Sequence, residues 1–229
     1  MIQAFPQARP FLPSKLRWRL ADATDEGPSP YQLPAQVVGF DGGGWWEASF
    51  GEMQAGTGLH HRALRAMALA LRGGRKVEVP FLEMSPIGLP LVGTFGDGST
   101  FSDGGHLIGS ACSAELVDPV GVRDDTAYVR ILTGQPLLGG DMFSLDRGET
   151  MGSELHCTEA VEEVEAGIWA VTIGPQFRAA HAAGTLVDFS TPRCAMRLRD
   201  PDGGLWPTFD RSWIGRSSAM FVEAFGTQL

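Results

Sequence analysis

Glycine and proline interrupt this chain too often for long helices. Together they make up 45 of the 229 residues, 30 glycines and 15 prolines, which is about a fifth of the chain against roughly an eighth in average composition. No Gly-X-Y period accompanies the surplus, so a collagen-like fold is excluded. Both residues weaken helix interiors and are favoured in turns. The surplus therefore indicates many turns and a mainly β fold.

The charge and apolar content of the chain narrow its class further. Charged residues make up 20% and hydrophobic residues 43%, with a formal charge of −9, so neither a polar disordered tail nor a membrane bundle is expected. The acidic balance argues against a protein whose main task is to grip phosphate backbones. No run of 18 apolar residues occurs, and residues 1–13 lack the apolar core of a signal peptide. We expect no membrane insertion and no secretion by a signal peptide.

The cysteines argue against a disulfide framework and against a zinc knuckle. Cys112, Cys157 and Cys194 are odd in number, widely spaced and without a C-x-x-C pair. Three reduced and mostly buried thiols, made in a cytoplasm, fit this pattern best.

Four stretches in the first part of the chain have the pattern of strands. Leu16 to Leu20 alternates apolar and polar residues, and Val77 to Leu82 does the same. Gln36 to Phe40 and Trp46 to Phe50 flank Asp41-Gly42-Gly43-Gly44, which has enough glycine for a tight turn. We expect these two stretches to form a hairpin.

One stretch has a helical period. Between residues 58 and 72, apolar side chains fall at i, i+3, i+4 and i+7, on Leu64, Met67, Ala68 and Leu71. Gly73 and Gly74 follow where a left-handed residue commonly ends a helix. The pattern predicts one helix over about 58–72 among the strands.

The second half of the chain reads as a separate β domain. A long Gly-rich stretch from Ser85 to Gly109 precedes it, of the kind that marks a domain boundary or a contact arm. The strand candidates beyond it are Ala127 to Leu132, Met142 to Leu145, Ile168 to Ile173, Leu186 to Phe189, Cys194 to Arg199 and Ala219 to Phe225.

These patterns predict a mainly β protein with two domains. The first, 1–90, is expected to consist of strands around one helix, and 91–126 of a long loop or arm. Residues 127–204 are expected to form a small β-barrel or sandwich, and 205–229 a strand that returns to one of the domains.

Searches for catalytic and binding motifs find little. The nucleophile elbow, the zinc H-E-x-x-H and the phosphate-binding P-loop are absent, and Gly56-Thr57-Gly58 reads as the approach to a helix. Oxygens for calcium are offered by Asp97, Ser99, Ser102 and Asp103, but their spacing does not match an EF-hand. Side chains of this kind also stabilise tight turns, which is the interpretation we favour.

The histidines do not form a recognisable site in the sequence. His60 and His61 are adjacent, so on a helix they diverge by about 100 degrees and do not clamp one metal; His60 is expected to be half-buried. A Cys-His nucleophile built from His106, His156, Cys157 and Asp103 would need a convergence that spacing alone does not provide. We expect no catalytic residue, no cofactor site and no metal site, and hence no enzyme.

Two further groups of residues have alternative interpretations. The acidic run Glu159, Glu162, Glu163 and Glu165 is typical of a solvated face, or of the lining of a passage that repels DNA. Trp45, Trp206 and Trp213 are candidates for stacking on sugars, as in a carbohydrate-binding module, although burial is the commoner state of tryptophan. A cell-wall hydrolase would need paired carboxylates or a Cys-His site.

A succession of segments resembles tail proteins of long-tailed bacteriophages and of phage-like gene transfer particles. In order and spacing they cover most of residues 16–200. They are Gln36 to Phe40 through Trp46 to Phe50, the helix with Leu71 to Gly74, Asp97 to Gly104, Leu138 to Leu145, Thr172 to Ala180 and Asp188 to Leu198.

This resemblance implies a distal tail protein, whose belt domain, a β-sandwich with one helix over residues 1–90, forms a hexameric ring between the tail tube and the hub, with a smaller β domain on the outside. The implied partners are further copies of the chain, the tube protein, the hub or baseplate protein, and the tape measure protein and DNA that pass through the lumen. The implied location is the virion tail tip, after assembly in the host cytoplasm. A tail tube protein or a hub-associated baseplate protein is the alternative within this class.

Overall fold

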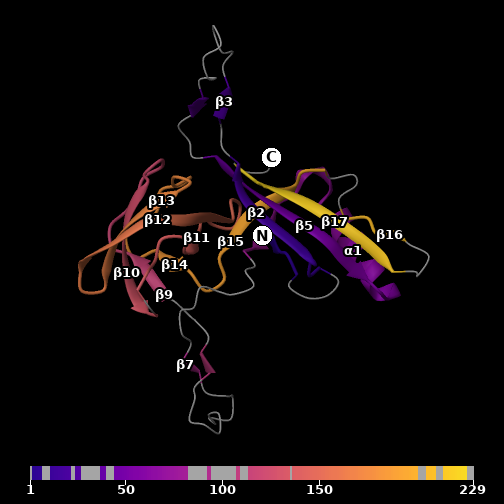
Figure 1. The fold of residues 1–229 in the computed structure, drawn as a ribbon, viewed down its shortest axis with the longest axis horizontal. Helices are drawn as coiled ribbons and strands as arrows, with labels where there is room; N and C mark the ends of the chain where they lie inside the picture. Colours follow the sequence, from indigo (N-terminus) through magenta and orange to yellow (C-terminus); the bar gives the residue numbers. More distant parts are fainter. Residues whose placement is uncertain are drawn as a thin grey trace. The chain divides into compact units, whose positions relative to one another are not determined.

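A computed structural model describes most of the chain. The described residues are 2–6, 11–21, 24–26, 37–39, 44–81, 92–93, 107–108, 113–134, 136–200, 205–209 and 214–225. Over this part the predicted fold class is confirmed: the protein is mainly β, with one α-helix, an open antiparallel sheet and a closed antiparallel barrel (Figure 1). The chain divides into two compact units, a sheet unit (1–80, 148–152 and 194–229) and a barrel unit (81–147 and 153–193).

The sheet unit is built around the long strands β5 (Trp45–Ala55) and β17 (Gly215–Glu223), which pair with each other. The described strands run in the order β1-β6-β15-β17-β5-β2, and β16 also pairs with β17. The remaining bounds are β1 Gln3–Ala4, β2 Lys15–Ala21, β6 Val77–Pro80, β15 Arg193–Leu198 and β16 Thr208–Phe209. Five of these strands, β2, β5, β17, β15 and β16, form the open antiparallel sheet, and β1 lies parallel to β6.

The expected hairpin between Gln36 to Phe40 and Trp46 to Phe50 is wrong, although both stretches contain strands. β4 (Val37–Gly39) pairs with β3 (Thr24–Glu26), whereas β5 pairs with β2 and β17. The physical reason is that β5 is buried in the centre of a sheet, where both of its hydrogen-bonding edges are taken by longer partners.

Helix α1, Gly58–Ala70, matches the predicted helix closely. The Thr57 hydroxyl accepts a hydrogen bond from the backbone N–H of His60 at 3.3 Å, which caps the first turn. The predicted apolar stripe is buried, and the helix is followed by the short 3-10 turn η2 (Arg72–Gly74), in which Gly73 and Gly74 have φ values of 72° and 76°. These left-handed conformations explain why glycine ends the helix.

A cluster of aromatic side chains forms the centre of the core of the sheet unit, on one face of the sheet. Phe5 contacts Phe11, Phe50 and Phe221 edge to face, with ring centroids 5.3–5.5 Å apart. Such arrangements add to the stabilisation from burial. Since side chains alternate along a strand, the residues on either side of Phe50 and Phe221 point to the opposite face.

The barrel unit is a closed barrel with the strand order β10-β13-β12-β11-β14-β9. The bounds are β9 Ser113–Leu116, β10 Thr126–Thr133, β11 Met142–Asp146, β12 Ser153–Glu165, β13 Ile168–Gly174 and β14 Leu186–Asp188. Apolar residues from all six strands fill its interior, among them Leu116, Val129, Phe143, Val171 and Val187. A two-stranded pair, β7 (Val92–Gly93) with β8 (Leu107–Ile108), precedes the barrel.

Three segments lie elsewhere than the sequence analysis places them. Ser113–Leu116, expected in the arm 91–126, is the barrel strand β9, because Ala114 and Leu116 alternate inward. β15, expected in the second domain, pairs with β17 in the sheet unit. The longest strand, β12, was not predicted, because its second half consists mostly of glutamates. The expected final strand is β17.

Candidate functional site

An arginine-rich face forms the side of the open sheet opposite to the phenylalanine core. Strand register aligns Arg19, Glu47, Val222 and Arg197 in one row across four strands. The neighbouring row is Arg17, Ser49, Met220 and Arg199. We call these four arginines the arginine face; Lys15 and Arg216 lie beside it on the same side of β2 and β17. Arginines thus flank on both sides a strip that contains a single charged side chain, Glu47.

Glu47 is the buried carboxylate in the middle of this face. It accepts hydrogen bonds from Arg19 Nε at 2.7 Å, Arg199 Nη1 at 3.3 Å and Trp45 Nε1 at 3.3 Å. Burial alone raises the pKa of Glu47, but these hydrogen bonds and the two positive charges outweigh it, so the pKa lies below its usual value. One carboxylate therefore holds two arginines in place while leaving one positive charge in excess.

Arg17 and Arg197 carry the unbalanced charge of the face. Both side chains are exposed, and no ion pair joins either of them to a carboxylate within the described ranges. Lys15, by contrast, pairs with Glu52, and the Lys15 ammonium lowers the pKa of that carboxyl. The face is thus most positive at Arg17 and Arg197.

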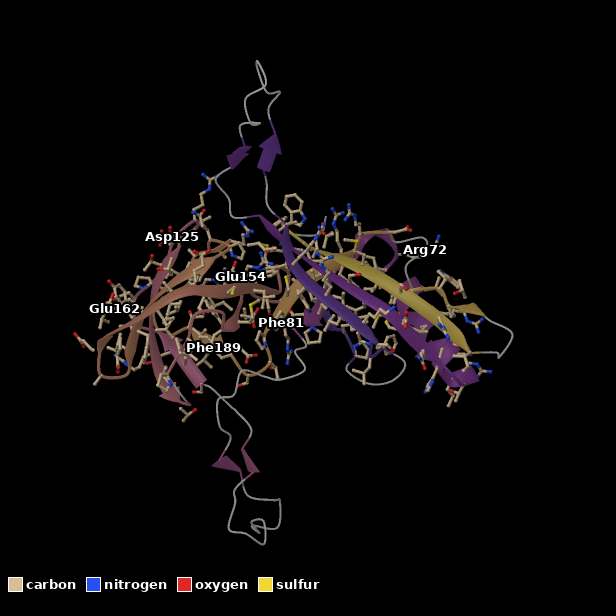
Figure 2. The ribbon with its side chains drawn as sticks, viewed as in Figure 1. Arg72, Phe81, Asp125, Glu154, Glu162 and Phe189 are labelled. Carbon is tan, nitrogen blue, oxygen red and sulfur yellow. The ribbon has the colours of Figure 1, made fainter. Side chains whose placement is uncertain are left out.

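An acidic segment, residues 159–165 of β12, is the opposite kind of surface on the barrel unit. Glu159, Glu162, Glu163 and Glu165 are all exposed, as predicted for a solvated face, and Figure 2 shows Glu162 on the outside of the barrel. The Glu163 carboxylate accepts a hydrogen bond from Gly167 N–H at 3.0 Å across the turn to β13. In the part of the chain that the structure describes, no cation lies within ion-pair distance of the four.

The two units differ strongly in net charge. Over its ranges the sheet unit carries 13 Lys and Arg against 12 Asp and Glu, a formal charge of +1. The barrel unit carries 5 against 15, a formal charge of −10. The net negative charge of the chain therefore comes entirely from the barrel unit.

A buried polar cluster of Glu154, His156 and His181 lies inside the barrel unit. Glu154 Oε1 is 2.5 Å from His181 Nε2 and 3.5 Å from His156 Nε2, while Oε2 accepts the backbone N–H of Arg178 at 2.9 Å. His156 Nδ1 is 2.7 Å from the carbonyl oxygen of Pro175, so Nδ1 carries a proton. The His156 ring packs against Phe143 and Phe177.

The surroundings of Glu154 favour its ionised form. Burial alone raises the pKa of Glu154, but hydrogen bonds and charge from His156 and His181 outweigh it and lower the pKa to about 2. Figure 2 labels Glu154 away from Glu162, which lies near the other end of β12, and the side chains of Glu154 and His156 are 0% exposed. A carboxylate with this pKa and no access to solvent is suited to holding the beginning of β12 against the 174–181 segment.

The histidine and cysteine hypotheses have clear outcomes where the structure describes the residues. His60 is half-buried as expected, and His61 is the more buried of the two. His156 and Cys157 are consecutive on β12, so their side chains point to opposite sides of the strand and do not form a nucleophile pair. Cys157 is half-buried and Cys194 is buried. Sequence reasoning missed Glu154, although the alternation of Glu154 and His156 was a usable signal.

Of the three tryptophans that are candidates for stacking on sugars, the two that the structure describes differ in their exposure to solvent. Trp45 is half-buried and donates to Glu47, whereas Trp206 is 44% exposed. Trp213 lies outside the described residues, and so do Asp97, Ser99, Ser102, Asp103, His106 and Cys112.

No metal site or membrane span is found in the described ranges. No group of three or more His, Cys, Asp or Glu side chains there is placed to hold a metal ion. In those same ranges, no helix has both the length and the apolar content to cross a membrane.

Comparison with known proteins adds no family to these observations, since no family model and no curated protein matches the chain.

Proposed function

We propose that the chain is a structural, non-enzymatic subunit of the tail tip of a long-tailed phage or gene transfer particle. In this role it acts as a distal tail protein. Six copies form a ring that joins the tail tube to the hub and leaves a lumen for the tape measure protein and DNA.

The plan of the described chain is the observation that carries the proposal. A sheet unit with one helix is continued by a smaller barrel unit, which is the combination that the resemblance implies. The segments behind the resemblance include α1 with its terminal glycines, β11, and the stretch from β14 into β15. They therefore lie in both units.

The open edge of the sheet gives this proposal a physical basis. β2 is seven residues long and, among the described strands, pairs only with β5. Its other edge presents backbone N–H and C=O groups that can pair with a strand of another chain. A subunit with such an edge is suited to repeating around a ring.

Labelling the chain in assembled particles tests the proposal. We expect a single ring of this protein at the distal end of the tail, and a purified protein that sediments as an oligomer. A strictly monomeric chain that never joins particles would contradict the proposal. Many stacked rings per particle would instead identify a tail tube protein.

A carbohydrate-binding role is a second candidate, favoured by the exposed Trp206. An indole that is 44% exposed can stack on a sugar ring. Trp206→Ala is then expected to abolish binding to host surface glycans while leaving the oligomer intact, and Leu59→Ala, at an exposed non-aromatic position, is the control. The absence of glycan binding in the unmodified protein would exclude this role.

A further inference from the structure

The arginine face and the acidic segment are complementary surfaces carried by the same chain. We propose that the arginine face of one copy binds the acidic segment, 159–165, of a second copy. The contact is heterologous, since two different surfaces meet, and contacts of this kind build rings or open filaments. This inference deepens the proposed function. The ring depends on the proposed function, whereas the contact between two copies does not.

The clustering of like charges on each surface supports the pairing. Arg17 and Arg19 are two residues apart on one side of β2, where side chains at i and i+2 are separated by about 6.8 Å. On β12 the strand pairing shifts register between Glu163 and Glu165, so these glutamates are not held at the regular spacing. Guanidinium groups and carboxylates can therefore meet as two charged clusters, without a fixed one-to-one register.

Both surfaces also present apolar side chains. The two pairs of arginines stand about 14 Å apart, across three strand spacings, and Met220 and Val222 lie half-buried in the strip between them. On the acidic segment Val164, which adjoins Glu163 and Glu165 in the sequence, is 46% exposed. Apolar side chains among charged ones are the ordinary composition of a protein interface.

A second copy fits the face better than nucleic acid does. The chain itself supplies the acidic counterpart, because the barrel unit holds a formal charge of −10. The same charge repels a phosphate backbone from the molecule as a whole. A contact between two copies of the chain also requires no other molecule to be present.

Two double variants separate the contact from the stability of the fold. The face variant carries Arg17→Glu and Arg197→Glu, which are exposed and lack an ion pair in the described structure, so that Glu47 keeps Arg19 and Arg199. The segment variant carries Glu162→Lys and Glu165→Lys and spares Glu163, which caps the turn. Arg62→Glu with Arg72→Glu, and Asp118→Lys with Glu149→Lys, make the same charge changes at exposed positions elsewhere.

Sedimentation measures self-association of each protein up to about 1 mM, where even contacts with a Kd of 1 mM are substantially populated. Each double variant alone is expected to weaken association at least about tenfold, because like charges then face each other. An equimolar mixture of the two is expected to restore it, since every contact between the two variants again joins opposite charges. Association of the unmodified protein is expected to fall as salt rises.

Several results would overturn the contact. These are variants that associate as the unmodified protein does, a mixture that stays as weak as its components, association insensitive to salt, or an unmodified protein that is monomeric throughout. Loss of duplex DNA binding by the face variant, with association unchanged, would assign the face to nucleic acid. If any of these results is found while the protein still forms a ring in particles, the contact is wrong and the proposed function stands. If the mixture of variants restores association but the protein is absent from particles, the contact stands and only the proposed function is wrong.

Discussion

Each unit contains a buried carboxylate whose pKa is held low, but the partners of the two carboxylates differ. Glu47 of the sheet unit is held by Arg19 and Arg199, whose side chains are 51% and 55% exposed. Glu154 of the barrel unit is held by His156 and His181, whose side chains are only 0% and 4% exposed. The first pairing reaches solvent and the second does not.

This difference determines what each carboxylate contributes. Arginine stays charged at any pH a protein survives, and an exposed guanidinium released from Glu47 is still solvated by water. A histidine is charged only when protonated, and neither His156 nor His181 can turn to solvent. Glu154 is therefore expected to matter more for stability and to make the barrel unit more sensitive to acid.

The largest expected effect is that of Glu154→Gln. Gln puts an NH2 group where one oxygen of Glu154 accepts a hydrogen bond, and a buried donor that loses a charged acceptor costs about 3 kcal/mol or more. Trp169 is the one tryptophan in the sequence ranges of the barrel unit, so the fluorescence difference between the protein and its Trp169→Phe variant isolates barrel unfolding in urea. Glu162→Gln, exposed on the same strand, is the control. An unchanged barrel transition in Glu154→Gln would contradict the comparison.

Acid is the next largest perturbation. The folded pKa of Glu154 is about 2, against 4.5 for the free side chain, so its contribution is present above pH 4.5 and is lost as pH falls toward 2. The loss corresponds to the order of 3 kcal/mol of barrel stability. Urea melts at pH 5 and near pH 2.5 measure it. The difference between the two melts should shrink in Glu154→Gln, and an equal acid loss in that variant would show that other groups carry the effect.

Glu47→Gln is expected to have a smaller effect. Arg19 and Arg199 can turn to water, and the neutral amide can keep one hydrogen bond, so the cost to the sheet unit is about 1 kcal/mol. Fluorescence of the Trp169→Phe background reports this transition. Destabilisation equal to that of Glu154→Gln would mean that exposure of the partners does not set the cost.

Glu52→Gln is expected to have the smallest effect. Its pairing with Lys15 is exposed on both sides, and exposed ion pairs contribute little to stability because water and salt screen them. The urea midpoint of the sheet unit should be indistinguishable from that of the unmodified protein. A clear downward shift would show that this edge of β2 is more ordered than its exposure suggests.

Sequence patterns predicted those parts of the fold that follow local rules. The helix was predictable because its apolar period and the Gly73–Gly74 stop agree, and most barrel strands because they alternate. β12 was not, since four exposed glutamates hide a strand whose other end carries Glu154 and His156 into the interior. The pairing of β5 was also missed, because a glycine turn suggests a nearby partner while burial selects β17, which lies more than 150 residues away.

The candidate surfaces were harder to predict than the strands. The acidic run was visible in the sequence because its residues are neighbours. The arginine face was not visible, because Arg17 and Arg197 come to lie on the same face of the sheet only through the register of four strands. A single sequence shows neither that register nor which of two faces of a strand is solvated.

The insertion of the barrel unit within the sheet unit has a consequence for synthesis on the ribosome. Every barrel strand, through Asp188, has been translated before β17, the strand that joins β5, β15 and β16. At about 5–20 residues per second, roughly 2–7 s separate Asp188 from Glu223. The barrel can fold during this interval while the earlier half of the sheet waits with β5 unpaired along one edge. The nascent chain therefore passes through a state in which an apolar strand edge is exposed, and this is the stage at which chaperone binding would be most useful.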